Sequence, residues 1–277
     1  MGRAHCCDTI ERFAERYRVV PSDTARLIEQ AVIGGDWGAN GYTTMAQADR
    51  LATELGLGPD SVLADIGCGR GWPGLYLAAR TGCKVVLSDV PKEALRIAKR
   101  RAVSEELEPR ATVVCASAVQ LPFASGSFDA IVHTDVLCCV RPKLTLIREC
   151  ARVLRAGGRM AFLSIHPAAD LTPWQRRRAS RDGPVHVALS RPHRELLARA
   201  GFRNTAEYDL TEEFFAVSQN WIEQWDLHRA DMEALWGRDA YQQRQRERPT
   251  QLRATQLGLL RRSLVSAHLS PRRPSAV

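Results

Sequence analysis

The sequence predicts an α/β fold with a parallel β-sheet and helices on both of its faces. First, an apolar run at 62–66 breaks into alternate glycines just before a helical pattern resumes. Second, short β-branched runs and helical spacings alternate along the chain, as they do in sheets with right-handed crossovers. Third, the chain has 277 residues, 45% of them hydrophobic, which suffices for one extended domain.

Residues 1–50 are expected to form a helical cap before the sheet. Apolar spacing predicts two short helices between residues 8 and 33. The segment 34–41 is too rich in glycine for a helix or a strand, and a further helix is predicted over 45–56. Tyr42 lies between these two segments and is thereby brought close to the first strand.

Residues 51–211 are expected to form the core, in which strands and helices alternate. Strands are predicted near residues 62–66, 84–88, 111–115, 128–133, 159–165 and 203–210. Helices are predicted near residues 74–81, 91–106, 142–154 and 193–200. Such an alternation indicates a parallel sheet, since parallel neighbours need crossover connections.

Residues 212–261 are expected to form a helical insertion, and 262–277 the last strand and a tail. Aromatic side chains supply the apolar faces of the insertion, and four of the six tryptophans follow residue 170. A run with β character at 263–269 then supplies a seventh strand. Two explanations of the aromatic faces remain open, namely a lid over an organic substrate and ordinary core packing.

The turn after the first strand is the clearest candidate for a binding site. Glycine at 67, 69 and 71 removes the Cβ at alternate positions of the turn, so that a ligand can lie directly against the backbone. A dinucleotide fingerprint would need its third glycine at position 72, where this chain has Trp72. The spacing therefore disfavours a nicotinamide dinucleotide.

The second strand ends in a carboxylate, Asp89. In an open α/β sheet the ligand lies beyond the carboxyl ends of the strands, where an acidic residue can accept hydrogen bonds from a ribose diol. The alternative is an exposed aspartate in a turn between strand and helix.

The segment from Asp65 to Gly71, D-x-G-x-G-x-G, resembles the first motif of the class I S-adenosylmethionine-dependent methyltransferases. Residues 121–132 and 152–162 are similar to two later signatures of that superfamily, in the same order and spacing. The resemblance covers roughly residues 60–165 and points to the small-molecule branch that includes the ubiquinone and menaquinone methyltransferases. It implies a Rossmann-like, seven-stranded, mostly parallel sheet with a helical cap, a helical insertion and an antiparallel last strand.

The resemblance implies S-adenosylmethionine as the cofactor. By position it assigns to the cofactor Asp65, Gly67, Cys68, Gly69, Gly71, Asp89, Val90, Ser117, Ala118 and Asp135, and Tyr42 is a further candidate for closing over the cofactor carboxylate. Asp65 would order the loop and the amino group of the cofactor, Asp89 would take the ribose hydroxyls, and Val90 would flank the adenine. Ser117 stands where an acidic acceptor for the adenine amino group is usual. A hydroxyl makes a weaker contact there than a carboxylate would.

Methyl transfer needs few catalytic residues, because the donor is already activated and the protein mainly aligns the reactants. A hydroxyl, thiol or enol acceptor must lose a proton, for which a histidine of near-neutral pKa is suited. His166 ends the fifth predicted strand and His133 the fourth, so these two are the catalytic candidates. A structural role is the alternative for each.

The expected function is methyl transfer to O, N or C of a small, aromatic or lipophilic metabolite. One alternative is an RNA or protein methyltransferase, which the basic runs at 176–181 and 244–248 favour. Those runs lack the interleaved aromatic residues that stack on bases, so we interpret them as solvated surface and do not expect nucleic acid as a partner. A cofactor-binding protein without transferase activity is the other alternative.

The remaining features of the composition narrow the class further. The formal charge of +8 is spread through the chain, and only four of the 39 basic residues are lysine. No run approaches the ~20 apolar residues that cross a bilayer, and no apolar signal region is visible, so we expect a soluble, cytoplasmic protein. The eight cysteines include no C-x-x-C pair, and no metal site is expected. Only the doublets Cys6-Cys7 and Cys138-Cys139 are candidates for thiol reactivity.

Overall fold

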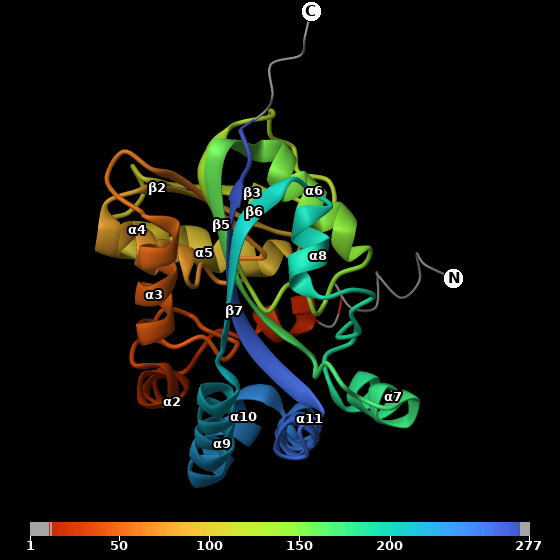
Figure 1. Ribbon diagram of the computed structural model, residues 1–277. Coiled ribbons are helices and arrows are strands. Elements are labelled where there is room, and N and C mark those ends of the chain that lie inside the picture. Colours follow the sequence, from red (N-terminus) through yellow and green to blue (C-terminus); the bar gives the residue numbers. More distant parts are fainter. Residues whose placement is uncertain (1–10, 12, 272–277) are drawn as a thin grey trace, which may run out of the picture.

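The computed structural model describes residues 11 and 13–271 and is organised around one seven-stranded sheet (Figure 1). The strands lie in the order β3-β2-β1-β4-β5-β7-β6. Their bounds are β1 Val62–Ile66, β2 Lys84–Asp89, β3 Ala111–Cys115, β4 Phe128–Thr134, β5 Leu154–Pro167, β6 Phe202–Asp209 and β7 Leu260–Leu269. Neighbouring strands from β1 to β5 pair in parallel, whereas β7 runs antiparallel to both β5 and β6. The predicted fold class is confirmed.

Helices cover both faces of this sheet (Figure 1). On one face α3 (Met45–Leu55), α4 (Gly74–Thr81) and α5 (Lys92–Ser104) pack against side chains such as Leu63 and Leu87. On the other face α6 (Lys143–Val153) and α8 (His193–Ala198) pack against side chains such as Ile66 and Phe162. These strands are apolar on both sides, as strands buried between two layers of helices must be.

Two helical segments flank the sheet at one end. A helical stretch over 13–18 and α2 (Asp23–Ile33) precede the sheet, and Ser22 caps α2 by accepting a hydrogen bond from the Ala25 N–H. Between β6 and β7 lie α9 (Thr211–Leu227), α10 (Arg229–Trp236) and α11 (Arg238–Gln256), which group together beyond the sheet in Figure 1. We call these three helices the lid. Helix α2 packs against α9.

One helix was not expected from the sequence. Helix α7 (Pro173–Asp182) contains the basic run at 176–181, and a capping box of Thr172 and Gln175 begins it. Its capping residues were a signal in the sequence. The helix has no apolar stripe, however, so the spacing of apolar residues did not predict it. In the described part of the chain, no helix combines the length and apolar character that a membrane crossing requires.

Candidate functional site

The turn after β1 has the conformation that its glycines allow. Gly67 and Gly69 have φ values of 74° and 54°, in the left-handed region. A Cβ at Gly67 would lie 2.5 Å from Cγ2 of Val136, and one at Gly69 would lie 2.8 Å from the Tyr17 hydroxyl. There is therefore no room for a side chain at either glycine. The Ser88 carbonyl accepts hydrogen bonds from the N–H groups of Gly67 and Cys68, at 2.7 and 3.1 Å, which fixes the turn to β2.

Asp65 lies fully buried beneath this turn. Its Oδ2 accepts a hydrogen bond from the Gly74 N–H at 2.9 Å, which joins the end of β1 to the start of α4. Burial raises the pKa of the Asp65 carboxyl well above its usual value. No partner for Oδ1 lies among the residues that the structure describes. An unpaired buried acceptor is costly, so this atom fits a donor from a bound ligand.

Asp89, at the end of β2, holds the turn from the other side. Its Oδ2 accepts a hydrogen bond from the Gly69 N–H at 2.8 Å and its Oδ1 one from the Val90 N–H at 2.7 Å. Burial raises the pKa of the Asp89 carboxyl, and the two N–H groups oppose that shift. Each oxygen keeps a lone pair, as acceptance of two ribose hydroxyls requires. Asp65, Asp89 and the turn thus fit the methionyl and ribose parts of S-adenosylmethionine.

The side expected to hold the adenine is more open. Ser117 is exposed, and its Oγ accepts a hydrogen bond from the Val119 N–H at 3.5 Å, whereas Ala118 is half-buried. Val90 leads away from β2, and its carbonyl accepts a hydrogen bond from the Cys115 thiol at 3.5 Å. None of these contacts supplies the charged acceptor that Ser117 replaces.

Asp135 is held by a buried arginine that sequence reasoning did not single out. It follows β4 with a φ of 55°. The guanidinium of Arg262, on β7, is completely buried and donates to both Asp135 oxygens, at 3.1 and 2.9 Å. Arg262 also donates to the side chains of Thr43 and Gln47, at 2.9 and 3.0 Å. This network ties β4, β7 and the segment before α3 together. Nothing in the sequence marked Arg262, because the pairing arises only in the folded sheet.

Tyr42 lies at the junction of this network with the lid. Its hydroxyl donates to Gln251 at 2.8 Å, and its ring packs edge-on against Phe214, with 4.7 Å between the ring centroids. Its hydroxyl is thus engaged by the lid.

The two histidines proposed as bases lie elsewhere. His133 is completely buried and stacks on Phe162 at 4.6 Å, and neither of its ring nitrogens has a partner among the described residues. Burial, with a contribution from His193, lowers its pKa to about 3. The same two causes, in the same order, lower the pKa of His166 to about 4. The expected near-neutral pKa is therefore wrong for both side chains.

His166 belongs to a cluster on the sheet face covered by α8. Its Nε2 lies 2.9 Å from the Ser263 hydroxyl and 3.8 Å from Glu207, while His193 Nδ1 lies 2.9 Å from Glu207. One ligand atom from each of His166, His193 and Glu207 lies within 4.8 Å of the others. Each of these groups already has a hydrogen-bond partner within the protein.

Cys138 and Cys139 follow Asp135, and their sulfur atoms lie 3.8 Å apart as free thiols. The Cys138 thiol donates to the Asp135 carbonyl at 3.1 Å. The hydrogen bond between the two sulfur atoms lowers the pKa of the Cys139 thiol. Cys6 and Cys7 lie outside the described residues.

A pocket opens between the cap and the lid. It is narrow, with a volume of about 50 Å³. Trp221, Trp225 and Trp236 of the lid line it together with Arg70 of the glycine turn. The pocket thus adjoins the turn at Arg70, and it is narrow enough that an acceptor would have to displace cap or lid.

The pocket contains charged groups that sequence reasoning had assigned to the surface. Its lining includes Arg244 and Arg248, whose spacing of four residues puts them on one face of α11, whereas Arg246 is exposed. Trp221 and Trp225 show the same spacing on α9. Matched i,i+4 pairs of arginine and tryptophan were the signal in the sequence that could have revealed this lining.

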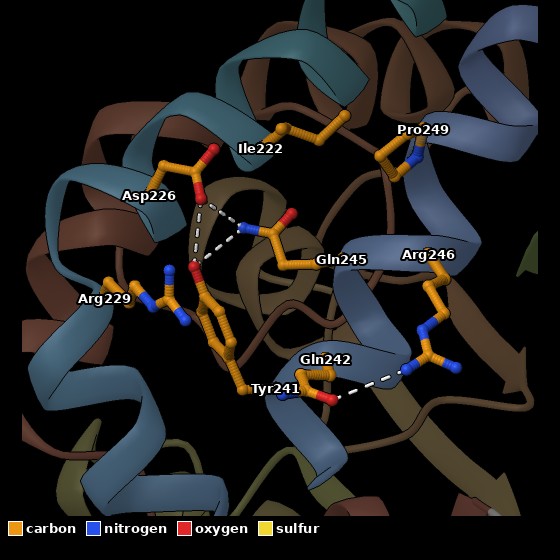
Figure 2. Close-up of a pocket in the computed structure, with 8 residues that line it drawn as sticks. All are labelled: Ile222, Asp226, Arg229, Tyr241, Gln242, Gln245, Arg246 and Pro249. Atoms are coloured by element: carbon orange, nitrogen blue, oxygen red, sulfur yellow. Dashed lines mark hydrogen bonds between the residues drawn. The ribbon is translucent and has the colours of Figure 1, made fainter. Parts of the chain in front are cut away.

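A second depression lies on the outer side of the lid, between α9 and α11 (Figure 2). Its polar groups satisfy one another, because the Tyr241 hydroxyl and the Gln245 amide donate to Asp226, at 3.0 and 2.8 Å. Arg246 is directed away from them and donates to Gln242 at 3.4 Å. Since the glycine turn contributes nothing to it, this depression is not the candidate site.

Comparison with known proteins agrees with this geometry. Residues 64–162 match the family model described as a methyltransferase domain. The chain is 37% identical to the methyltransferase GfsG of Streptomyces halstedii, over 42% of each protein. It is 31% identical to the 27-O-demethylrifamycin SV methyltransferase of Amycolatopsis mediterranei, over 61% of this chain and 64% of that one. The chain thus spans less than two thirds of these relatives.

Solved structures share the fold. A putative sarcosine dimethylglycine methyltransferase from Galdieria sulphuraria superposes with a TM-score of 0.78, at 15% identity, over 97% of this chain and 100% of that one. The phosphoethanolamine N-methyltransferase 2 of Haemonchus contortus, solved with S-adenosyl-L-methionine, gives a TM-score of 0.75 at 18% identity, over 91% of this chain and 58% of that one. Residues 64–162 are therefore similar to a methyltransferase domain, and the chain shares the fold of these solved methyltransferases.

Proposed function

We propose that this protein transfers the methyl group of S-adenosylmethionine to an O, N or C atom of a small, aromatic or lipophilic molecule. The observation that carries the proposal is that Arg70, in the glycine turn, also lines a pocket formed in part by three lid tryptophans. A donor against the turn would thus face a pocket with an aromatic wall, which has to widen by movement of cap or lid before it admits an acceptor.

The residues of the chain have separate tasks in this proposal. The cofactor supplies an activated methyl group, so that the protein has to align the acceptor and exclude water. Asp89 would hold the ribose, and Asp65 would offer its unpaired oxygen to a donor of the cofactor. The lid would cover the acceptor. Arg262 keeps Asp135 and the start of α3 in place beneath it.

No histidine is among the residues that line the pocket. We therefore expect His166→Ala to keep the initial rate of methyl transfer within about twofold, at pH 7.5 and saturating donor. The reason is its location in the cluster with His193 and Glu207, where its ring serves packing and hydrogen bonding. A loss of 100-fold or more in kcat, with unchanged KM and fold, would restore His166 as a base.

The relatives support a small acceptor. Their names give O-methylation of complex natural products, such as 27-O-demethylrifamycin SV and erythromycin at its 3'' oxygen. The inward direction of Arg244 and Arg248 also removes two positive charges from the basic run that would have favoured RNA.

The proposal is tested with S-adenosylmethionine carrying a labelled methyl group. Purified protein is incubated with a panel of phenols, polyketide aglycones, terpenoids and small amines, and separately with tRNA and with peptides. We expect label in an organic-soluble or low-molecular-mass product. Label confined to RNA or peptide would contradict the choice of acceptor, and absence of any transfer despite cofactor binding would contradict the activity.

A further inference from the structure

The pocket between cap and lid contains more positive than negative charge. Four arginines line it, namely Arg16 from the cap, Arg70 from the glycine turn, and Arg244 and Arg248 from α11. Among the described lining residues the carboxylate is that of Glu29 alone. Such an excess inside a narrow pocket is unfavourable unless a ligand balances it.

The nearby carboxylates are already committed. Arg16 pairs with Glu247 at 2.6 Å. One oxygen of Glu29 accepts the N–H groups of Trp37 and Ala39, at 2.7 and 2.8 Å, and burial raises the pKa of Glu29 to about 7. Glu29 is therefore only partly ionised near neutral pH, which leaves the excess of positive charge largely in place.

Arg248 shows the imbalance most clearly. It is 8% exposed, and its guanidinium carbon lies 4.6, 5.0 and 4.6 Å from the ring centroids of Tyr42, Trp221 and Trp225. These aromatic faces stabilise the cation in part. Its Nη1 has no hydrogen-bond partner in the described part of the chain. A buried guanidinium nitrogen that lacks an acceptor is suited to receive one from a ligand.

Arg244 lies one turn away on the same helix. Its guanidinium carbon stands 4.2 Å above the ring centroid of Trp236. Burial, followed by the charges of Arg16, Arg248 and Arg70, lowers its pKa to about 9. The two guanidinium groups are thus gathered on one wall of the pocket, between apolar rings.

We propose that Arg244 and Arg248 form a subsite for an oxyanion of the methyl acceptor, a phosphate, diphosphate or carboxylate group. The planar guanidinium fork matches such groups and binds them through paired hydrogen bonds. The tryptophans would take the apolar remainder of the acceptor, so that it is an anionic amphiphile. This inference rests on the proposed function, because the oxyanion is taken to belong to a methyl acceptor. The alternative ligand of the two guanidinium groups is the carboxylate of the cofactor.

The test uses inorganic pyrophosphate as the probe, titrated calorimetrically at low ionic strength into the protein with and without saturating S-adenosylhomocysteine. The variants are Arg244→Met, Arg248→Met and the pair, with Arg246→Met as matched control on the outer face of the same helix. We expect the double variant to bind pyrophosphate at least tenfold more weakly and the control to match the wild type. The affinity for S-adenosylhomocysteine should stay within twofold throughout.

Each contrary result has its own meaning. Equal pyrophosphate binding by the wild type and the double variant, or none by the wild type, would overturn the subsite. A loss of S-adenosylhomocysteine affinity in the double variant would assign the arginines to the cofactor instead. Failure of the wild type to bind S-adenosylhomocysteine would refute the proposed function while leaving pyrophosphate binding as a separate readout. If the double variant does not fold, Arg244→Met alone decides, since Arg244 is the less buried of the two.

Discussion

At the scale of single residues, Asp89 is the central side chain of the candidate site. Its carboxylate accepts the N–H groups of Gly69 and Val90 and so shapes the turn that would hold the donor. The same carboxylate is the group proposed to grip the ribose, so that one side chain links local structure to binding.

We expect Asp89→Asn to weaken binding of S-adenosylhomocysteine about 10- to 100-fold. The amide loses one acceptor oxygen, and a hydrogen bond to a charged group contributes about 1.5–3 kcal/mol. Isothermal titration calorimetry measures the change, with the exposed Asp170→Asn as control. Unchanged affinity in a folded Asp89→Asn protein would remove Asp89 from the site.

The residues of the turn could be predicted from the sequence, whereas those of the pocket could not. Gly67, Gly69 and Asp89 have roles set by their places at strand ends, which a linear pattern encodes. Arg248 becomes part of a site only because α11 folds back against α9, and Arg262 only because β7 inserts beside β5.

At the scale of elements, the ion pair of Arg262 and Asp135 joins β7 to the end of β4. The pair is buried and is completed by Thr43, which precedes α3, and by Gln47 in the first turn of α3. Gln47 in turn donates to Glu213 of the lid at 2.6 Å. The sheet end, the cap and the lid are thereby held in one network.

We expect Arg262→Met to lower the free energy of unfolding by about 3–5 kcal/mol, because it leaves Asp135 buried without its partner. Chemical denaturation measures the change. Arg261→Met is the matched control on the same strand, since its ion pair with Asp209 is exposed and contributes about 1 kcal/mol or less. The double variant Arg262→Met with Asp135→Asn should lose less unfolding free energy than the two single variants lose together. Strictly additive losses would show that the two side chains are not coupled.

Helices and strands with a regular apolar period could be predicted closely. The expected strands at 62–66 and 111–115 and the expected helix at 74–81 coincide with β1, β3 and α4. Helix α7 could not be predicted from an apolar period, since its residues are mainly polar and only Ala179 among them is buried.

At the scale of the whole molecule, the burial of neutral histidines makes the fold sensitive to acid. His133 is neutral in the folded protein down to a pKa of about 3, whereas an unfolded histidine titrates near 6.5. The neutral form is thus favoured by folding. Its contribution is present above pH 6.5 and is lost as the pH falls toward 3.

We expect the wild type to lose about 1.4 kcal/mol of unfolding free energy per pH unit below 6.5 through His133 alone. His133→Phe keeps the ring against Phe162 and removes the titrating group, so its stability should fall less steeply between pH 6.5 and 4.5. Urea denaturation at several pH values measures both slopes. His166 contributes a smaller loss of unfolding free energy, of the same sign, in both proteins. Equal slopes for the two proteins would contradict the assignment of the acid sensitivity to His133.

The most direct test of the account is a crystal structure of the protein with S-adenosylhomocysteine. We predict the ribose hydroxyls on the Asp89 carboxylate, the methionyl part against Gly67 and Gly69, and the sulfur facing the pocket of the lid tryptophans. A ligand bound elsewhere, or a turn that takes up a nicotinamide dinucleotide equally well, would contradict it.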